Sequence, residues 1–149
     1  MKLKIVIPFY NVETTIKRTV DSIKMQSVDN FDCVLIDDGS IDQTNRILEE
    51  NINNDSRFRI IKNDQNNGSP IENIVAGLKK LTINDDDVCI LIDGDDWLYT
   101  DKALETIINI YEFNDINLTY GHYVTYPDGN KNIAPELPKW VKSHNLYRC

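Results

Sequence analysis

The stretch VCILIDGDDWL, residues 88–98, decides how this chain is expected to fold. Its first five residues form an unbroken apolar run rich in β-branched side chains, which is typical of a parallel strand buried on both faces. We therefore predict a central and nearly fully buried strand over residues 88–92. In such a strand Leu91→Ala would remove core packing and cost about 2–5 kcal/mol.

Three carboxylates follow this predicted strand within four residues: Asp93, Asp95 and Asp96, around a turn at Gly94. Like charges this close repel one another, and hard divalent cations accept all-oxygen ligands of this kind. The pattern therefore suggests a Mg²⁺ or Mn²⁺ site. The alternative is an Asp-rich turn whose side chains cap the next helix and face water, because Asp is common in turns.

Length, composition and charge indicate one ordered globular domain. The chain has 149 residues, of which 41% are hydrophobic, and this length is sufficient to bury a sizeable core. The formal net charge of −8 and a pI of ≈ 4.7 oppose nonspecific binding of nucleic acid, which requires clustered Lys and Arg. The oligomeric state is left open.

Cysteine usage and hydropathy indicate a cytoplasmic protein. Cys33 and Cys89 lie inside apolar runs, Cys149 is terminal, and there is no C-x-x-C pair, so neither a disulfide framework nor a zinc site is indicated. The N-terminal apolar stretch is too short for a signal peptide, and no run is long enough for a transmembrane segment.

Apolar periodicity alternates along the chain between strand and helix patterns. Strands are expected at residues 3–7, 31–36, 58–61, 88–92 and 118–126, with a helix after each of the first four. This alternation predicts an α/β fold with a doubly wound, mostly parallel sheet. A turn at residues 127–130 can return the last strand as an antiparallel hairpin.

Several residues mark where these elements begin or end. Pro8 is expected to stop the first strand, because proline cannot donate to a strand ladder. Asn11 is a candidate N-cap of the first helix. Residues 40–43 (S-I-D-Q) and 69–72 (S-P-I-E) read as capping boxes of the second and third helices, the latter with proline at the first helical position.

A polar segment follows each of the first four predicted strands: residues 8–11, 37–40, 63–68 and 93–96. The carboxyl ends of parallel strands lie at one edge of a sheet, and ligands bind there at the point where the strand order reverses. The four segments are therefore expected to form one shared site.

The motifs in these segments favour a nucleotide held through a metal ion. Neither G-x-x-x-x-G-K-[S/T] nor G-x-G-x-x-G follows any predicted strand, so phosphates would have to be held by the metal. The ring of Tyr10 and an acceptor at Asp37 or Asp38 suit a nucleobase, which has a face to stack and N–H groups to donate. Each also has a structural reading: Tyr10 as a surface aromatic, and Asp37 as a turn acceptor.

Three segments resemble the nucleotide-binding half of family 2 glycosyltransferases, which have the GT-A fold. They are IVIPFYNVE at residues 5–13, VLIDDGSIDQT at 34–44 and ILIDGDDWL at 90–98. Their order and spacing match, and the resemblance extends over about residues 2–126.

The resemblance implies one GT-A-like, Rossmann-like domain over residues 1–149. Its nucleotide and metal half would be residues 1–98, and residues 99–149 would begin a short acceptor-side region. Such enzymes transfer a sugar from a nucleotide diphosphate sugar to an acceptor hydroxyl, usually with inversion, and use Mn²⁺ or Mg²⁺. The sugar, the nucleotide and the acceptor, whether glycan, lipid or protein, are not given by the sequence.

Individual roles follow from the same resemblance. Pro8 and Tyr10 would line the base pocket, Asp38 would accept from the base, and Asp96 would be the principal metal ligand. The full set of candidates is Pro8, Tyr10, Asn11, Asp37, Asp38, Asn66, Gly68 and Asp95 for the nucleotide, and Asp93, Asp95 and Asp96 for the metal.

The chain departs from the family pattern in two respects. Where family members often carry a basic residue in the helix after N-x-G, this chain has Glu72 and Asn73. The catalytic base of the family lies in a later half of the chain, and the candidates here are the two acids after the fifth predicted strand, Asp128 and Glu136.

Two other functions stay open, the first of them because the family's catalytic base lies in that later half. One is a nucleotide-sugar-binding module without catalysis, or a truncated donor-binding half. The other is a phosphohydrolase that uses D-x-D as nucleophile and acid, although that motif would be expected after the first strand and followed by Thr or Val, whereas here Trp97 and Leu98 follow it.

Overall fold

The computed structural model describes residues 1–132. Its elements are, in chain order, β1 (Leu3–Phe9), α1 (Ile16–Lys24), β2 (Phe31–Asp37), α2 (Thr44–Ile52), β3 (Phe58–Lys62), α3 (Pro70–Lys80), β4 (Val88–Leu91), α4 (Ala103–Phe113), β5 (Tyr123–Val124) and β6 (Lys131–Asn132). The chain divides into two compact units, residues 1–105 and a second that begins at residue 106. Whether they act as one domain stays a prediction.

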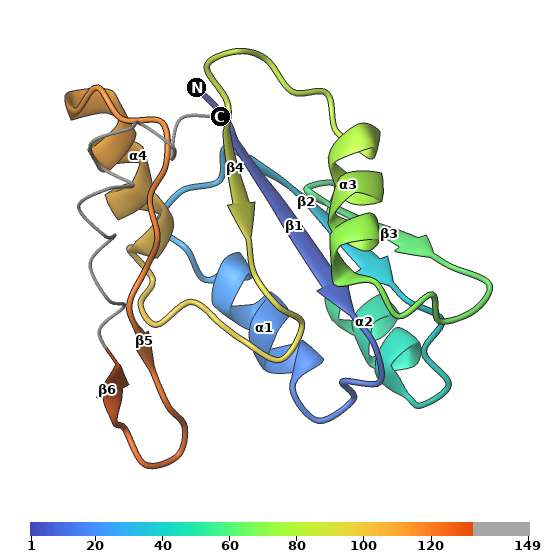
Figure 1. Ribbon diagram of the computed structural model, residues 1–149. Helices are drawn as coiled ribbons and strands as arrows, with labels where there is room; N and C mark the ends of the chain where they lie inside the picture. The colour runs from blue at the N-terminus through green and yellow to red at the C-terminus, as the bar shows by residue number, and fades with distance from the viewer. Residues whose placement is uncertain (133–149) are drawn as a thin grey trace. The chain divides into compact units, whose positions relative to one another are not determined.

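The first unit is a four-stranded parallel sheet in the order β3-β2-β1-β4. The chain moves outward from β1 to β3 and then returns across the sheet to β4. Because parallel crossovers are right-handed, this reversal places α3 on the face opposite α1 and α2, as Figure 1 shows. The predicted doubly wound α/β fold is confirmed, and the strand order reverses between β1 and β4.

The core lies on both faces of β1 and β2. Every residue of β1 is buried, and α1 covers one face with Ile16, Val20 and Ile23, all 0% exposed. On the other face Val6, Val34 and Ile36 pack with Leu78 and Leu81 from α3 and its C-cap. The two inner strands therefore carry the double burial that the sequence analysis assigned to β4.

The prediction that β4 is central and nearly fully buried is wrong for the described residues, because β4 lies at one end of the four-stranded sheet. Val88 and Ile92 are each 8% exposed, whereas Leu91 is 56% exposed. The strand thus alternates between a buried and an exposed face. An apolar run shows what a strand can bury, but its position depends on which strands pair beside it.

Leu91→Ala is consequently expected to cost about 1 kcal/mol or less, because little apolar surface leaves water at this site. Leu35→Ala in β2, where the side chain is 0% exposed, is the matched core variant and should cost several times more. Denaturant unfolding of both variants checks this. Equal losses of unfolding free energy in the two variants would mean that Leu91 is a core residue after all.

The start of α3 follows the sequence prediction, but those of α1 and α2 do not. Ser69 caps α3 and accepts a hydrogen bond from the backbone N–H of Glu72, with Pro70 at the first helical position. Asn11 is not an N-cap: it has a φ of 51°, and the N-cap of α1 is Thr15.

The expected box at residues 40–43 does not form either, because α2 begins after Gln43. Pro8 does not end its strand, since β1 continues to Phe9. In the loops after β1 and β2, hydrogen bonds between the two loops replace the expected helix caps.

A buried lysine, Lys4 of β1, connects the amino ends of β1, β2 and β4. The Lys4 side chain is 5% exposed; its Nζ lies 2.7 Å from Asp32 of β2 and 3.7 Å from Asp87, which precedes β4. Lys2 adds a second ion pair to Asp32 at 2.6 Å and donates its backbone N–H to Asp87 at 2.8 Å. This end of the sheet is therefore held by charge, away from the predicted site.

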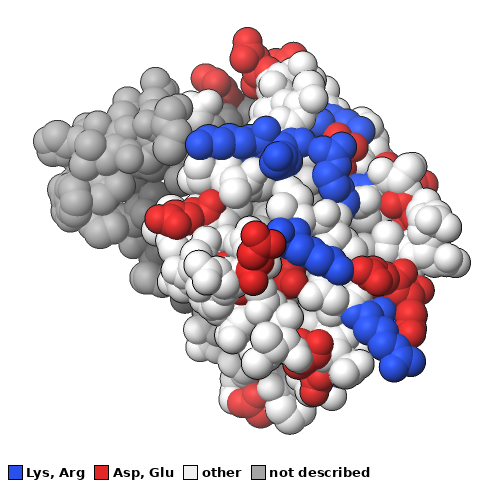
Figure 2. Space-filling model, turned by 90° about the vertical axis from the view of Figure 1, so that its right-hand side faces the viewer, with Lys and Arg blue, Asp and Glu red and all other residues white. Residues whose placement is uncertain are grey.

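The β3 edge carries charged side chains. Arg59 donates to the carbonyl of Lys80 at the end of α3, and Lys62 pairs with Glu49 of α2. Figure 2 shows this face, with Lys and Arg side chains crossing it beside acidic ones. Charges on an exposed edge strand oppose pairing with another chain.

The second unit contains the predicted C-terminal hairpin in shortened form. Tyr123–Val124 (β5) pairs antiparallel with Lys131–Asn132 (β6), so the strand expected over residues 118–126 is reduced to two residues. None of the helices in the described part of the chain has both the length and the apolarity that a membrane span requires.

Candidate functional site

The four polar segments that follow β1, β2, β3 and β4 are joined by hydrogen bonds in the order of the strands. The Asp38 N–H donates to the Phe9 carbonyl, the Asn63 N–H to the Asp37 carbonyl, and the Gly94 N–H to the Pro8 carbonyl. The expectation that these segments share one edge of the sheet is confirmed. We call this edge, residues 8–15, 37–43, 63–69 and 93–101, the rim.

The loops after β1 and β2 lock together through reciprocal bonds. Ser40 Oγ accepts from the Asn11 N–H and Asn11 Oδ1 accepts from the Ile41 N–H, both at 2.9 Å. This exchange explains why neither Asn11 nor Ser40 caps a helix. Two neighbouring side chains extend it: Thr44 Oγ1 accepts from the Val12 N–H, and Glu13 accepts from the Gln43 N–H.

Asp38 anchors the loop after β3. Its side chain is buried, and its carboxylate accepts from Asn63 Nδ2 at 3.0 Å, the Asn67 N–H at 3.1 Å and the Gly68 N–H at 3.2 Å. Burial raises the pKa of Asp38, but these hydrogen bonds lower it more, so the pKa lies below its ordinary value. Asp38 is therefore an ionised acceptor that already has three donors.

Asn73 of α3 completes this cluster. It is 3% exposed, and its Oδ1 accepts from the side chains of Asn63 at 2.9 Å and Asn67 at 3.2 Å. In the sequence, Asn73 stands out only as a departure from the family pattern. In the fold it supports the same loop that Asp38 holds.

Asp37 also has partners within the protein. It is 2% exposed and accepts from the Ser40 N–H at 2.8 Å and from Asn45 Nδ2 at 2.6 Å. Between Asp37 and the next loop, Gly39 has a φ of +77°, and a Cβ atom there would lie 2.6 Å from the backbone of Gln65. The rim is therefore packed tightly enough to require glycine at this position.

The other nucleotide candidates lie on the same rim. Pro8 precedes Phe9, the last residue of β1, and the Tyr10 side chain that follows is 42% exposed, so its ring is open to a ligand. Asn66 and Gly68 belong to the loop after β3, where Asn66 Oδ1 accepts from the Gly68 N–H at 2.6 Å. Their role in binding a nucleotide stays a prediction.

Gly94 is enclosed where β1 and β4 diverge. Its N–H donates to the Pro8 carbonyl at 3.1 Å, and a Cβ atom on it would lie 2.4 Å from Cβ of Phe9. No other residue fits this gap without moving the end of β1. The turn of residues 93–96 is thus fixed to the point where the strand order reverses, where α/β sheets bind ligands.

The three carboxylates of this turn are exposed at the rim. Partial burial, followed by repulsion from Asp95 and Asp93, raises the pKa of Asp96 above its ordinary value. A cation would relieve this repulsion. Within residues 1–132, however, no three Asp, Glu, His or Cys side chains converge on a point as a ready-made metal cage.

This donor set fits an ion whose remaining ligands come from a bound diphosphate. Mg²⁺ is usually held by one or two carboxylates together with substrate phosphates, not by a cage made only of protein. The rim segments contain no Lys or Arg, so a diphosphate bound there would need positive charge from elsewhere. Asp96, with Asp95 and Asp93, could supply the carboxylate ligands.

Side chains of α1 and of the turn after it, which were not singled out in the sequence, support the segment after the carboxylate turn. Thr19 donates to the Gly94 carbonyl, Ser22 accepts from the Leu98 N–H, and Gln26 bonds Thr100 and Leu104. Their spacing along a helix was a readable signal, because such residues share a face. What they contact could not be read from the sequence.

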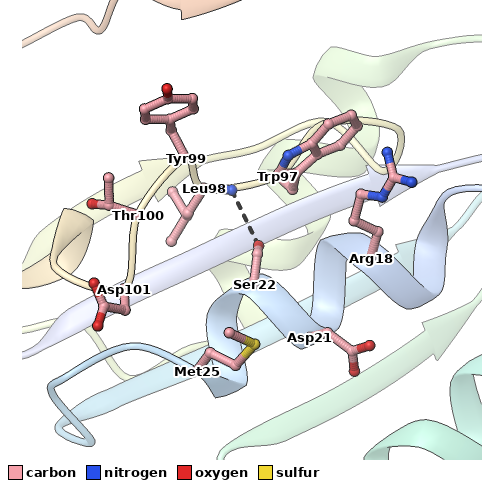
Figure 3. Close-up of a pocket in the computed structure, with 9 residues that line it drawn as sticks. All are labelled: Arg18, Asp21, Ser22, Met25, Trp97, Leu98, Tyr99, Thr100 and Asp101. Carbon is pink, nitrogen blue, oxygen red and sulfur yellow. Dashed lines mark hydrogen bonds between the residues drawn. The ribbon is translucent and has the colours of Figure 1, made fainter. Parts of the chain in front are cut away.

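The same segment and α1 border a surface cleft of about 220 Å³. Figure 3 shows Arg18 and Trp97 at one end of it and Met25 and Asp101 at the other. The Arg18 guanidinium lies 4.6 Å from the centre of the Trp97 ring, a cation–π contact. Trp97 therefore packs onto α1 directly after the carboxylate turn.

The candidates for a catalytic base lie in the second unit. Asp128 is in the turn between β5 and β6, where hydrogen bonds from Thr125 and Asn130 keep its pKa below its ordinary value. These are the contacts of a turn residue. Glu136 lies outside the described residues.

Comparison with known proteins places this geometry in a family. The model of the family described as "Glycosyl transferase family 2" matches residues 4–148. A Haemophilus influenzae protein described as an uncharacterized glycosyltransferase is 32% identical over 121 residues, 81% of this chain and 46% of that protein.

Two further similarities name a donor. The Escherichia coli protein "UDP-Glc:alpha-D-GlcNAc-diphosphoundecaprenol beta-1,3-glucosyltransferase WfgD" is 29% identical over 140 residues, 90% of this chain and 51% of that protein. The crystal structure of S. aureus TarS 1-349 in complex with UDP-GlcNAc superposes with a TM-score of 0.67 at 25% identity, over 76% of this chain and 32% of that one.

These matches cover most of this chain but only part of each relative. The chain spans 46% of the Haemophilus protein and 32% of the TarS chain. The match to the family model over residues 4–148, together with the GT-A-like sheet, shows that this chain belongs to glycosyl transferase family 2.

Proposed function

We propose that this chain binds a nucleotide diphosphate sugar at the rim and serves as the donor-binding part of a metal-dependent, inverting glycosyltransferase. The observation that carries the proposal is the position of the carboxylate turn, residues 93–96, at the point where the strand order reverses. UDP-sugar donors are named for two of the similar proteins, so uridine diphosphate sugars are the first donors to test.

The donor would lie across the rim from β2 to β4. The exposed ring of Tyr10 offers a stacking surface for the base, next to the loops held by Asp37 and Asp38. The diphosphate would lie at the 93–96 turn, where Asp96 and its neighbours would hold Mn²⁺ or Mg²⁺. That ion would neutralise charge that develops on the departing diphosphate.

In the proposed reaction an acceptor hydroxyl attacks the anomeric carbon of the sugar. The new C–O bond forms as the bond between that carbon and the diphosphate oxygen breaks, with inversion, and the acceptor proton passes to a base. We assign no residue to that base. Since nucleotide sugars are the proposed substrates and Cys33 and Cys89 are free thiols, we keep the reducing cytoplasm as the proposed location.

The test of this function is a panel of nucleotide sugars offered to the chain with Mn²⁺, with binding and donor turnover measured separately. Binding with transfer or donor hydrolysis supports the enzyme. Tight binding without turnover supports the alternative of a binding module or donor-binding half. Hydrolysis of a generic phosphate ester that is lost in Asp93→Asn would instead favour the phosphohydrolase.

Asp38→Ala tests the base side of the site. The substitution leaves three hydrogen-bond donors of the loop at residues 63–68 without their acceptor and removes the predicted acceptor for the base. Nucleoside diphosphate binding should therefore weaken by about 1–3 kcal/mol. Pyrophosphate binding should barely change. Titration calorimetry with both ligands and Mn²⁺ checks this, with Asp64→Ala, an exposed carboxylate in the same loop, as control. Equal losses for both ligands would place Asp38 on the metal side.

A further inference from the structure

One face of α1, with the N-cap before it and the turn after it, carries polar side chains at helical spacing: Thr15, Thr19, Ser22 and Gln26. Intervals of four, three and four residues keep side chains on one face of a helix. We call these four residues the polar seam. Thr19 is 0% and Gln26 is 7% exposed, so the seam is covered by another part of the chain.

The part that covers it is the segment that follows β4. Thr19 Oγ1 donates to the Gly94 carbonyl at 3.0 Å, and Thr15 Oγ1 approaches the same oxygen at 3.4 Å. The Gly94 N–H is held from the other side by the Pro8 carbonyl at 3.1 Å. The peptide groups on both sides of Gly94 are therefore fixed, one by β1 and one by α1.

The rest of the polar seam contacts the backbone of residues 98–104. Ser22 Oγ accepts from the Leu98 N–H at 3.1 Å, the contact marked in Figure 3. Gln26 donates to the Thr100 carbonyl at 2.7 Å and accepts from the Leu104 N–H at 2.9 Å. All these contacts go to backbone atoms, so the seam fixes the course of the segment and does not depend on its side chains.

We propose that the polar seam positions the carboxylate turn for binding of the metal and the diphosphate. Thr19 does so by its hydrogen bond to the Gly94 carbonyl. The inference rests on the proposed function. The like charges on Asp93, Asp95 and Asp96 repel one another and favour turn conformations in which the three carboxylates lie further apart. Holding the backbone on both sides of Gly94 keeps the carboxylates together before the ligand arrives, which lowers the cost of binding.

Thr19→Val tests the inference, because valine has nearly the same shape but no hydroxyl. It leaves the buried Gly94 carbonyl with the distant Thr15 hydroxyl as its side-chain donor. We expect the Kd for UDP with Mn²⁺ to rise about tenfold, while the Kd for UDP with EDTA stays unchanged. Thr19→Ser keeps the hydroxyl and should restore most of the metal-dependent affinity.

Two further variants separate positioning from a general loss of stability. Thr82→Val changes an exposed threonine between α3 and β4, outside the rim, and should behave as the wild type. Gln26→Leu removes the bonds to Thr100 and Leu104, far from the turn. It should lower the melting temperature at least as much as Thr19→Val but raise the metal-dependent Kd less, because it leaves Gly94 held.

The outcomes are distinct. If the wild type binds UDP with Mn²⁺ and Thr19→Val binds it equally well, the seam has no positioning role and the proposed function stands. If affinity across the variants follows only their melting temperatures, the seam is merely structural and the inference is overturned. If the wild type itself fails to bind any nucleoside diphosphate with metal, the proposed function fails, and this inference fails with it.

Discussion

Asp96→Ala is expected to abolish the rise in melting temperature that we predict for the wild-type protein with UDP and Mn²⁺. Asp93, Asp95 and Asp96 lie within four residues, and a diphosphate adds further negative charge at the same place, so metal and diphosphate should bind this turn together. A ligand at a hundred times its Kd stabilises the native state by about 2.7 kcal/mol, which is about 5–10 °C for a domain of this size. Thermal scans with UDP, Mn²⁺ and EDTA measure the shift.

Asp86→Ala is the matched control, because Asp86 is an exposed carboxylate just before β4, at the opposite end of the same strand. The two variants change the net charge equally, so a general charge effect would appear in both. Asp86→Ala should keep the full shift. A full Mn²⁺-dependent shift in Asp96→Ala would instead mean that the carboxylate cluster is only a polar turn.

Asp32→Asn is expected to cost about 2–3 kcal/mol of stability, because it leaves the buried Lys4 ammonium with one distant carboxylate, Asp87 at 3.7 Å. The loss stays below that of a fully buried pair, since the Asp32 side chain is 34% exposed. Lys4→Met removes the buried cation itself and should cost less, and the double variant should recover much of the loss. A double-mutant cycle by urea unfolding measures the coupling.

The pH dependence of stability provides an independent check. Burial raises the pKa of Asp32, but hydrogen bonds from Lys2 and Lys4 lower it more; hydrogen bonds from Asn84 and Lys2, with the charge of Lys4, keep the pKa of Asp87 low. Because both values lie below those of the unfolded chain, this stabilisation is present above the unfolded pKa and is lost as pH falls through the folded values. Lys4→Met should flatten that acid limb, and an unchanged limb would contradict this role.

Much of the site follows from local sequence. The polar segments that follow the first four strands were identified from their position after apolar runs, and the structure joins them along one edge of the sheet. The start of α3 at Ser69 was also readable, because its cap and Pro70 act within one helical turn. The family resemblance of residues 5–13, 34–44 and 90–98 agrees with the family match.

The misreadings arose where distant segments compete with local signals. Asn11 has the chemistry of an N-cap, but its side chain bonds Ile41, and its backbone bonds Ser40. Asp38 is a different case, because its predicted contact with a base stays a prediction and the structure adds that it holds the loop at residues 63–68. For both residues the partners lie about thirty residues away in sequence, with hydrogen-bond separations of 29 and 30.

By itself the sequence determined the approximate positions of the first four strands and of the helices that follow them, where acid follows a strand, and that alternating elements build a parallel sheet. These are properties of short windows, in which side-chain periodicity and caps act on neighbouring residues. Tertiary structure alone decided that β1 and β2 are the inner strands, that Leu91 is exposed, and that the hydroxyl of Thr19 holds Gly94. Strand order and side-chain-to-backbone contacts depend on which segments meet across the fold, and no local pattern specifies that meeting.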